Sequence, residues 1–378
     1  MATEDSTYVA RMKAAGCIVV GKTNMPEFGL GSNTYNTLFG TTPNAWDITK
    51  SAGGSSGGAA VALAQRLLPV ADGSDFMGSL RNPAAWNHVW GLRPTQGRVP
   101  AWPRPDVWLA QLGTDGPMAR TVADLAALLH TQAGFEPRAP LSLDGTVPFT
   151  VPPADLRGLR IGWLGDLQGH LATEPGVLAA CEAALARLER AGAVVVPLRP
   201  RFDPAEVWEA WLTWRSALVA PAVGAVLASP GARARVKPEA LWEHERGQGL
   251  SAAALLQASA VRSRFHGQWL QQHEDADVLA LPAAQCWPFD ATLTWPRTLA
   301  GRTMDTYHRW MECTLYATFA CAPALSLPAG FDAAGRLPMG LQLVAPPRAD
   351  ARLLEVAVAC EPLFGDLLAR RPPEPALA

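Results

Sequence analysis

The chain has 378 residues, of which 49% are hydrophobic and 17% charged, and its formal net charge is −2. This composition is typical of a globular protein with a large core, and the charge gives no electrostatic basis for binding nucleic acid or an anionic membrane. No run of about 18 apolar residues occurs, so no membrane-spanning helix is expected. Residues 1–8 are polar and acidic, unlike a signal peptide, and we expect a cytoplasmic protein.

The first part of the chain alternates short predicted elements with polar loops. A Gly- and Asn-rich stretch covers residues 24–58, and Thr121 with Asp124 forms a capping-box-like helix start. The predicted helices are at 6–15, at 59–67, near Pro83 and at 121–130, and the predicted buried strands are at 17–20 and 68–71.

The second part alternates strands with amphipathic helices, which favours a parallel or mixed sheet covered on both faces. Strands are expected at 159–164, 193–196, 277–281, 324–327 and 340–344, and helices at 173–191, within 206–272 and from the capping residue Asp350. Residues 140–153 are the best candidate for a linker or long loop. We expect a single domain over residues 1–370 and a disordered, Pro-rich tail at 371–378.

Six cysteines lie far apart in the sequence, and no two of them form a C-x-x-C pair. This distribution has neither the spacing of a zinc site nor that of a disulfide framework. Most of the cysteines stand in apolar runs, so we expect buried free thiols and no metal site.

Two Gly/Ser clusters carry the chemical signal, GGSSGG at 53–58 and GSDFMGSLR at 73–81. Backbone N–H groups in such loops, beside a serine hydroxyl, suit acyl transfer, because the hydroxyl attacks a carbonyl and the N–H groups stabilise the oxyanion. A phosphate-binding loop would need a following Lys-Ser or Lys-Thr, which is absent. GGSSG also fits the nucleophile elbow of an α/β-hydrolase with Ser55, but residues 44–50 before it are not strand-like.

Around these clusters the sequence resembles the amidase signature family over nearly its whole length. The motifs that carry the resemblance occur in the family's order: AAG at 14–16, GKTNMPE at 21–27, NAWD at 44–47, NPAA at 82–85, GLRPTQGRV at 91–99, PALSLP at 323–328 and GLQLV at 340–344. The resemblance implies an α/β fold with a mixed central β-sheet surrounded by α-helices. It also implies hydrolysis of a carboxylic amide to an acid and ammonia or an amine, without a metal or an organic cofactor.

The resemblance implies roles for both clusters. Ser79 matches the acylated nucleophile, and Ser55, 24 residues earlier, matches the bridging serine that relays its proton. The backbone N–H groups of Phe76, Met77 and Gly78, with that of Ser79, match the oxyanion hole. The large side chains of Phe76 and Met77 replace smaller residues, so we expect a narrower pocket.

Other residues of the two clusters are expected to support the loops. Asp75 and Arg81 flank the nucleophile segment, and the resemblance implies that they hold it in shape. Ser56 and Ser74 are interpreted as residues that hydrogen-bond within their loops. His88 follows the nucleophile closely and, without a partner pattern, is interpreted as structural.

The catalytic lysine that the resemblance implies has no match in this chain. In the family, a neutral lysine with a depressed pKa acts as the base, in a segment resembling G-x-P-x-x-x-K-D upstream of the glycine loop. The only lysines, none of which matches that position, are Lys13, Lys22, Lys50 and Lys237. We therefore expect an N-terminally truncated member. Three explanations stay open: a start site further upstream, a truncated and impaired product, or a base supplied by another residue.

Two further functions stay open beside the amidase. One is a catalytically impaired or inactive amidase paralogue, and the other is a Ser–His esterase of the α/β-hydrolase type. The expected partner is a small-molecule amide, with no nucleic acid and no membrane, and a homodimer is kept open. Candidates for the wall of an apolar substrate pocket are Trp208, Trp211, Trp214 and Trp287.

Overall fold

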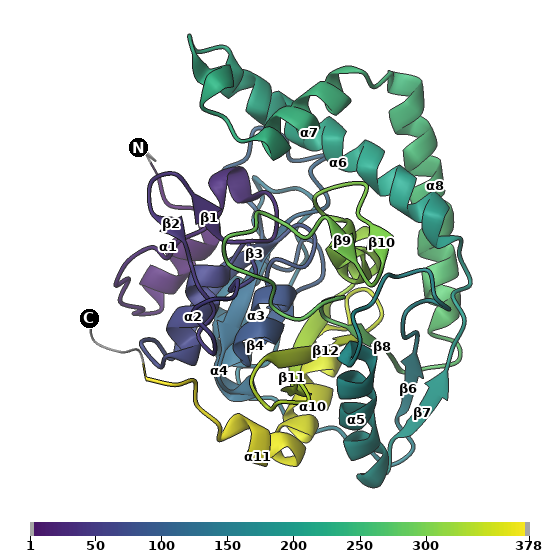
Figure 1. The fold of residues 1–378 in the computed structure, drawn as a ribbon. Coiled ribbons are helices and arrows are strands. Elements are labelled where there is room, and N and C mark those ends of the chain that lie inside the picture. The colour runs from purple at the N-terminus through teal and green to yellow at the C-terminus, as the bar shows by residue number, and fades with distance from the viewer. Residues whose placement is uncertain (1–3, 375–378) are drawn as a thin grey trace.

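The centre of the computed structural model, whose described residues are 4–374, is an eight-stranded mixed sheet (Figure 1). Pairing is antiparallel from β3 through to β8 and parallel where β6 pairs with β8 and β7. The strands, in spatial order, are β3 (Val70–Asp75), β5 (Thr114–Ala119), β4 (Trp90–Arg93), β11 (Ala324–Phe331), β12 (Pro338–Val344), β8 (Val278–Pro282), β6 (Arg160–Trp163) and β7 (Val194–Pro197).

Helices surround this sheet, so the predicted fold class is confirmed. Figure 1 shows a separate layer of helices, α6 (Pro204–Leu227), α7 (Pro238–Gln248) and α8 (Ala252–Gln272), along the top and right of the sheet. The remaining α-helices are α1 (Thr7–Ala14), α2 (Gly57–Ala64), α3 (Arg81–Asn87), α4 (Val122–Gln132), α5 (Val177–Arg190), α9 (Leu315–Phe319), α10 (Asp350–Cys360) and α11 (Gly365–Leu368).

Short elements complete the fold. Two two-stranded sheets are formed by β1 (Tyr35–Asn36) with β2 (Gly40–Thr41) and by β9 (Thr298–Leu299) with β10 (Arg302–Thr303). The 3-10 helices are Glu27–Gly29, Ala232–Ala234, Arg309–Thr314 and Glu361–Phe364. One large hydrophobic core extends from Met77 to Phe364, and it includes Val147 and Val151 from the long loop at 140–153.

The predicted buried strand at 17–20 is wrong. Its residues belong to no strand, and the side chains of Ile18, Val19 and Val20 are 88%, 55% and 71% exposed. A four-residue strand is stable only when a neighbour satisfies its backbone groups. The edge strand β3 pairs only with β5, so the run at 17–20 lies outside the sheet as an exposed apolar segment.

Other predicted elements appear with shifted bounds or different roles. The predicted strand at 68–71 is β3, which starts later and runs on through Gly73 to Asp75, half-buried for most of its length. The helix expected from 173 starts at Val177. The Asp350 side chain does not cap its own helix but accepts a hydrogen bond from the Thr95 N–H at 2.7 Å.

Helix α6 is the one described helix that is long and apolar enough to cross a membrane by length and composition. In the fold it packs against α7 and α8 and buries Trp208 and Trp211. It also carries Arg215, whose ion pair with Glu243 has side-chain exposures of 4% and 0%. A helix that buries an ion pair in this way serves as a core helix.

All six cysteines are free, as predicted, and four of them are buried, whereas Cys17 is exposed and Cys321 half-buried. Of the predicted disordered tail, residues 371–374 have no helix or strand, and residues 375–378 lie outside the described part of the chain.

Candidate active site

The predicted nucleophile Ser79 lies in the loop between the edge strand β3 and helix α3. Its side chain is 4% exposed. The preceding Gly78 has φ +88°, and a Cβ there would come within 2.5 Å of the Thr314 hydroxyl. Only glycine suits that backbone and that space, so Gly78 is required for the turn that presents Ser79.

The buried carboxylate of Asp75 organises this loop. It accepts hydrogen bonds from the Gly78 N–H at 2.7 Å and the Leu80 N–H at 3.2 Å, on either side of Ser79. Arg81 and Arg93 form buried ion pairs with it. Burial raises the pKa of Asp75, but the two arginines and the Gly78 N–H outweigh burial and lower it to about 2. The carboxylate is therefore ionised at neutral pH.

The glycine loop at 53–58 is held by Thr34. The Thr34 hydroxyl donates to the Gly53 carbonyl at 2.8 Å and accepts from the Gly57 N–H at 3.1 Å. A Cβ on Gly57 would come within 2.3 Å of that hydroxyl oxygen, so the contact depends on glycine. Ser51 adds a further contact, because its hydroxyl accepts from the Gly53 N–H at 3.0 Å.

The two Gly/Ser clusters meet at the predicted serines. The Ser56 N–H donates to the Ser79 carbonyl at 3.2 Å, and the Ser56 hydroxyl exchanges hydrogen bonds with the backbone of Ser74 at 3.3 and 3.4 Å. Ser55, whose peptide bond to Gly54 is cis, is 4% exposed, like Ser79. Within residues 4–374 neither the Ser55 nor the Ser79 hydroxyl takes part in a hydrogen bond, so neither is committed to a structural partner.

The backbone N–H groups of the nucleophile loop are not equivalent. That of Gly78 is donated to Asp75 and is not free in this conformation. Those of Phe76, Met77 and Ser79 have no acceptor among the described residues. The Met77 side chain is 1% exposed and belongs to the core, so its size fills the interior and does not narrow a pocket.

Phe76 packs against the helical layer. Its ring centroid lies 4.9 Å from the Arg215 guanidinium carbon, within range of a cation–π contact. Arg215 is held by Glu243 and by the Tyr307 hydroxyl, the latter at 2.8 Å. Tyr307 in turn donates to Glu243 at 2.6 Å. The nucleophile loop is therefore packed directly on a buried polar cluster of α6 and α7.

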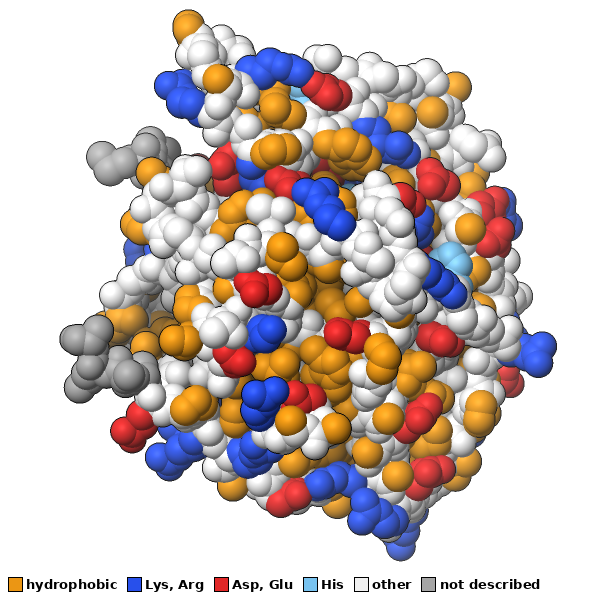
Figure 2. All heavy atoms as spheres, in the orientation of Figure 1, with side chains coloured by type: hydrophobic (Ala, Val, Ile, Leu, Met, Phe, Trp, Pro, Cys, Tyr) orange, Lys and Arg blue, Asp and Glu red, His pale blue; other side chains and the backbone are white. Residues whose placement is uncertain are grey.

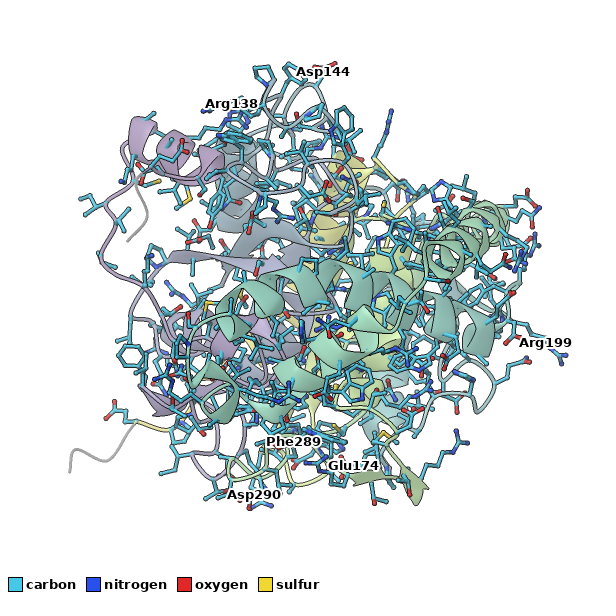
Figure 3. The ribbon with its side chains drawn as sticks, turned by 90° about the horizontal axis from the view of Figure 1, so that it is seen from above. Arg138, Asp144, Glu174, Arg199, Phe289 and Asp290 are labelled. Carbon is cyan, nitrogen blue, oxygen red and sulfur yellow. The ribbon has the colours of Figure 1, made fainter. Side chains whose placement is uncertain are left out.

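An aromatic group stands beside the glycine loop. Trp86 stacks on Trp310 with ring centroids 5.3 Å apart, and Phe289 meets Trp86 edge to face at 5.4 Å. A Cβ on Gly53 would lie 3.1 Å from the Trp86 ring. Figure 3 shows Phe289 beside Asp290, on the side of the molecule opposite Arg138 and Asp144. Of the expected pocket tryptophans, Trp208, Trp211 and Trp214 are buried in α6 and Trp287 is half-buried.

No lysine or histidine of the described chain hydrogen-bonds to Ser55 or Ser79. Lys237 is the one buried lysine, and its ammonium group donates to the Leu30 carbonyl at 2.9 Å. Burial is the main reason that the pKa of Lys237 is lowered to about 8. His88 lies at the far end of α3 and faces the Leu367 carbonyl at 3.0 Å. The described His, Cys, Asp and Glu residues form no group of three or more that could hold a metal ion.

Several residues that hold the site are not among the predicted site residues. Thr34 and Asn82 bond the glycine loop from segments distant in sequence, and Arg93 and Gln342 bond the Asp75–Arg81 pair. The sequence offers only a weak signal for these roles, because Arg93 and Gln342 are polar residues inside otherwise apolar strand sequences. Only the three-dimensional contacts show what they hold.

Comparison with known proteins agrees with this arrangement. The sequence model of the Amidase family matches residues 1–354. The chain is 34% identical over 398 residues to the A subunit of the glutamyl-tRNA(Gln) amidotransferase of Nocardia farcinica, covering 97% of this chain and 79% of the relative.

Among solved structures, a bacterial aryl acylamidase of the amidase signature enzymes matches with a TM-score of 0.88 and 27% identity, over 98% of this chain and 79% of that one. The A subunit of the glutamyl-tRNA(Gln) amidotransferase of Thermotoga maritima matches with a TM-score of 0.74 and 27% identity, over 95% of this chain and 76% of that one. Fold and relatives define the class of the protein as an enzyme that acts on amides. The chain belongs to the amidase signature family, which confirms the resemblance.

Proposed function

We propose that the chain hydrolyses a carboxylic amide through an acyl-enzyme on Ser79, with Ser55 as proton relay. The observation that carries the proposal is the hydrogen bond from the Ser56 N–H to the Ser79 carbonyl at 3.2 Å. This bond joins the two Gly/Ser loops at the two buried serines, whose hydroxyls are free of other described partners. Because Ser55 precedes Ser56 in the chain, this bond brings the loop of the relay serine against the loop of the nucleophile, as a nucleophile and its relay require.

In the proposed reaction, the Ser79 hydroxyl oxygen attacks the amide carbon while its proton passes to the Ser55 oxygen and the Ser55 hydroxyl proton passes on to a base. The N–H groups of Phe76, Met77 and Ser79 are the donors for the oxyanion, and the Gly78 N–H keeps the loop in shape through Asp75. The amine leaves with a proton returned through Ser55, and water then hydrolyses the acyl-enzyme.

The charge behind the nucleophile loop supports this role. Two buried arginines, Arg81 and Arg93, face the single carboxylate of Asp75 in the interior. One positive charge is therefore in excess directly behind the segment that would receive a negative oxyanion. A fixed charge in a water-poor site stabilises a developing charge more strongly than it would in water.

No described side chain hydrogen-bonds to the Ser55 hydroxyl. The family resemblance implies a lysine, and no described lysine contacts Ser55. This observation favours a second candidate, an amide-binding paralogue in which the loops are formed but Ser79 is not activated. The Ser–His esterase has less support, because no described histidine contacts Ser55 and no strand leads into its loop.

For the substrate, we favour a small aryl or apolar amide, acted on in the cytoplasm. The aromatic group of Trp86, Trp310 and Phe289 stands next to the glycine loop. Figure 2 shows hydrophobic side chains gathered in the hollowed central part of the visible face of the molecule. The fold also matches the aryl acylamidase, with a TM-score of 0.88, better than the Thermotoga maritima amidotransferase protein, with 0.74.

Fluorophosphonate labelling followed by peptide mass spectrometry tests the proposal. We expect label on Ser79, none in Ser79→Ala and much slower labelling in Ser55→Ala. Ser263→Ala, which removes an exposed hydroxyl on α8, is the matched control and keeps the normal rate. Absence of label on a chain that circular dichroism shows to be folded would support the amide-binding paralogue instead. An aryl amide and glutamine, offered to a chain that labels on Ser79, distinguish the two substrate classes.

A further inference from the structure

A cavity of about 420 Å³ lies away from the serine site. Ser79 precedes helix α3 and His88 follows it, so the two sites lie at opposite ends of this helix. The cavity is formed where the end of α3 and the start of α4 meet the C-terminal segment around α11, at the lower left of Figure 1. Its lining includes Trp46, Arg66, His88, Arg120, Glu361 and Arg370.

Three arginines face this cavity without a carboxylate partner. Within residues 4–374, none of Arg66, Arg120 and Arg370 forms an ion pair, although many other arginines of the chain do. Arg120 donates to the Leu68 carbonyl, and Arg66 makes no side-chain hydrogen bond to a described residue. The pKa of Arg66 is lowered, first by burial and then by the neighbouring cations Arg371 and Arg120. These cations therefore repel one another and leave a positive field.

The single carboxylate of the cavity does not neutralise this field. Glu361 accepts the N–H of Val122 at 2.9 Å and is thereby committed to the first turn of α4. Burial, followed by the nearby Asp124, raises the pKa of Glu361. An anion in the cavity would thus face three cationic side chains and one carboxylate, which already accepts a backbone hydrogen bond.

The cavity also contains a buried nitrogen without a partner. His88 is 7% exposed, and its Nε2 lies 3.0 Å from the Leu367 carbonyl, so Nε2 carries the proton. Its Nδ1 is buried and has no hydrogen-bond partner among the described residues. Buried polar atoms are normally satisfied. Burial, with the nearby Arg370, lowers the pKa of His88 to about 4, so the ring is neutral and Nδ1 is an acceptor. The unpartnered Nδ1 therefore points to a ligand that offers a hydroxyl donor beside its anionic oxygens.

Aromatic rings form the apolar part of the site. The His88 ring contacts both Trp46 and Phe331, with centroid distances of 5.6 and 4.7 Å, and the rings of Trp46 and Phe331 contact each other at 4.8 Å. The Arg370 guanidinium carbon lies 3.6 Å from the Phe331 ring centroid. The Arg370 Nη2 also donates to the Gly335 carbonyl at 2.6 Å. An arginine held by a ring and by one backbone carbonyl is pre-organised, and its remaining N–H groups can bind an oxyanion.

We propose that this cavity binds a small organic anion, a carboxylate or a phosphate monoester. The anionic group would lie among Arg66, Arg120 and Arg370, and the apolar part would contact Trp46. Arginine recognises both kinds of oxyanion through paired N–H donors. This site is separate from the serine site, and the proposal does not depend on the reaction at Ser79.

Isothermal titration calorimetry with benzoate, phenyl phosphate and inorganic phosphate as probes tests the proposal. We expect saturable binding of at least one of the first two probes to the full chain. Each arginine removed should weaken binding by about tenfold, so Arg66→Gln/Arg370→Gln should bind about 100-fold more weakly. Comparing benzoate with phenyl phosphate identifies the preferred oxyanion, and inorganic phosphate shows whether the apolar part is required.

The matched control is Arg199→Gln, an exposed arginine that projects at the right edge of the molecule in Figure 3 and does not line the cavity. It should bind the probes like the unmodified chain. Arg66 and Arg370 are exposed, so their replacement should leave the thermal unfolding curve unchanged. Failure of all probes to saturate at millimolar concentration would overturn the proposal. Equal affinity of the double variant and the unmodified chain would also overturn it.

Discussion

Asp75 and Arg81 form a two-point ion pair in the interior, with Nε–Oδ2 and Nη2–Oδ1 distances both of 2.9 Å. The side chains of both residues are fully buried. The same carboxylate receives the N–H groups of Gly78 and Leu80, and these residues flank Ser79 in the chain. The position of the candidate nucleophile is therefore determined by a charge pair that makes no contact with solvent.

Replacing Asp75 by Asn should strongly destabilise the fold, because Arg81 and Arg93 would be left as unpaired buried charges. Removing one partner of a buried pair costs about 3–5 kcal/mol. Urea unfolding measures this cost. The matched control is Asp305→Asn, whose pair with Arg309 has side-chain exposures of 55% and 21% and should contribute less than about 1 kcal/mol. Similar costs for the two variants would contradict the role given to Asp75.

The elements that were predictable from sequence are those with strong local signals. The capping box predicted at Thr121 is present, since its hydroxyl accepts the Asp124 N–H at 3.1 Å and donates to the Asp124 carboxylate at 2.7 Å. Strands β4 and β5 were not predicted. Their sequences, WGLR and TDGPMA, contain Gly, Pro and Asp, and they become strands only through pairing with β3 and β11.

The candidate site shows the same division between local and long-range information. The spacing of Ser55 and Ser79 and the glycines around them are visible in the sequence. The contacts of Thr34 and Arg93 are not, because each joins segments that are far apart and carries no local pattern. The apolar run at 17–20 shows the opposite error, since its local pattern predicts a strand but the sheet offers it no neighbour.

Gly73→Ala should disturb the contact between the two Gly/Ser clusters. A Cβ at this position would lie 2.5 Å from the Ser56 hydroxyl oxygen and 2.9 Å from a Leu80 methyl carbon, so both neighbours must shift. We expect a loss of stability of about 1–3 kcal/mol and slower fluorophosphonate labelling of Ser79. Thermal unfolding and the labelling rate measure the two effects.

A second glycine on the same chain provides the control for that change. A Cβ on Gly267, in helix α8, would meet nothing within 4 Å. Gly267→Ala should stabilise the chain by about 0.5–1 kcal/mol, because alanine is the better helix former, and it should leave labelling unchanged. Equal labelling rates in the two variants would show that Gly73 does not position the serines.

Lys237 should make stability depend on pH in the alkaline range. Its pKa is lowered from 10.5 to about 8, so between these values the folded chain binds fewer protons than the unfolded chain. The contribution of Lys237 to the free energy of unfolding therefore rises as the pH increases from 8 towards 10, by at most about 3 kcal/mol. The buried thiols Cys181 and Cys360, whose pKa values are raised by burial, oppose this trend, so the test must be differential.

Comparing the unmodified chain with Lys237→Met isolates that contribution, since the thiols cancel in the difference. The stability difference between the two proteins should grow in favour of the unmodified chain from pH 8 to pH 10, as followed by urea unfolding. Lys13→Met removes an exposed lysine paired with Asp5 and should show no such change. A pH-independent difference for Lys237→Met would mean that the ammonium group is not desolvated.

The exposed apolar segment at 17–20 should promote self-association of this chain. Ile18 is 88% exposed and Val20 71%, and they lie in one short run outside the sheet, where burial against another molecule would remove apolar surface from water. We expect the average mass in light scattering to rise with protein concentration and Ile18→Ser/Val20→Ser to reduce that rise. Leu256→Ser changes a single leucine on α8 that is 71% exposed and should have little effect. A concentration-independent monomer mass for the unmodified chain would exclude this segment as an association surface.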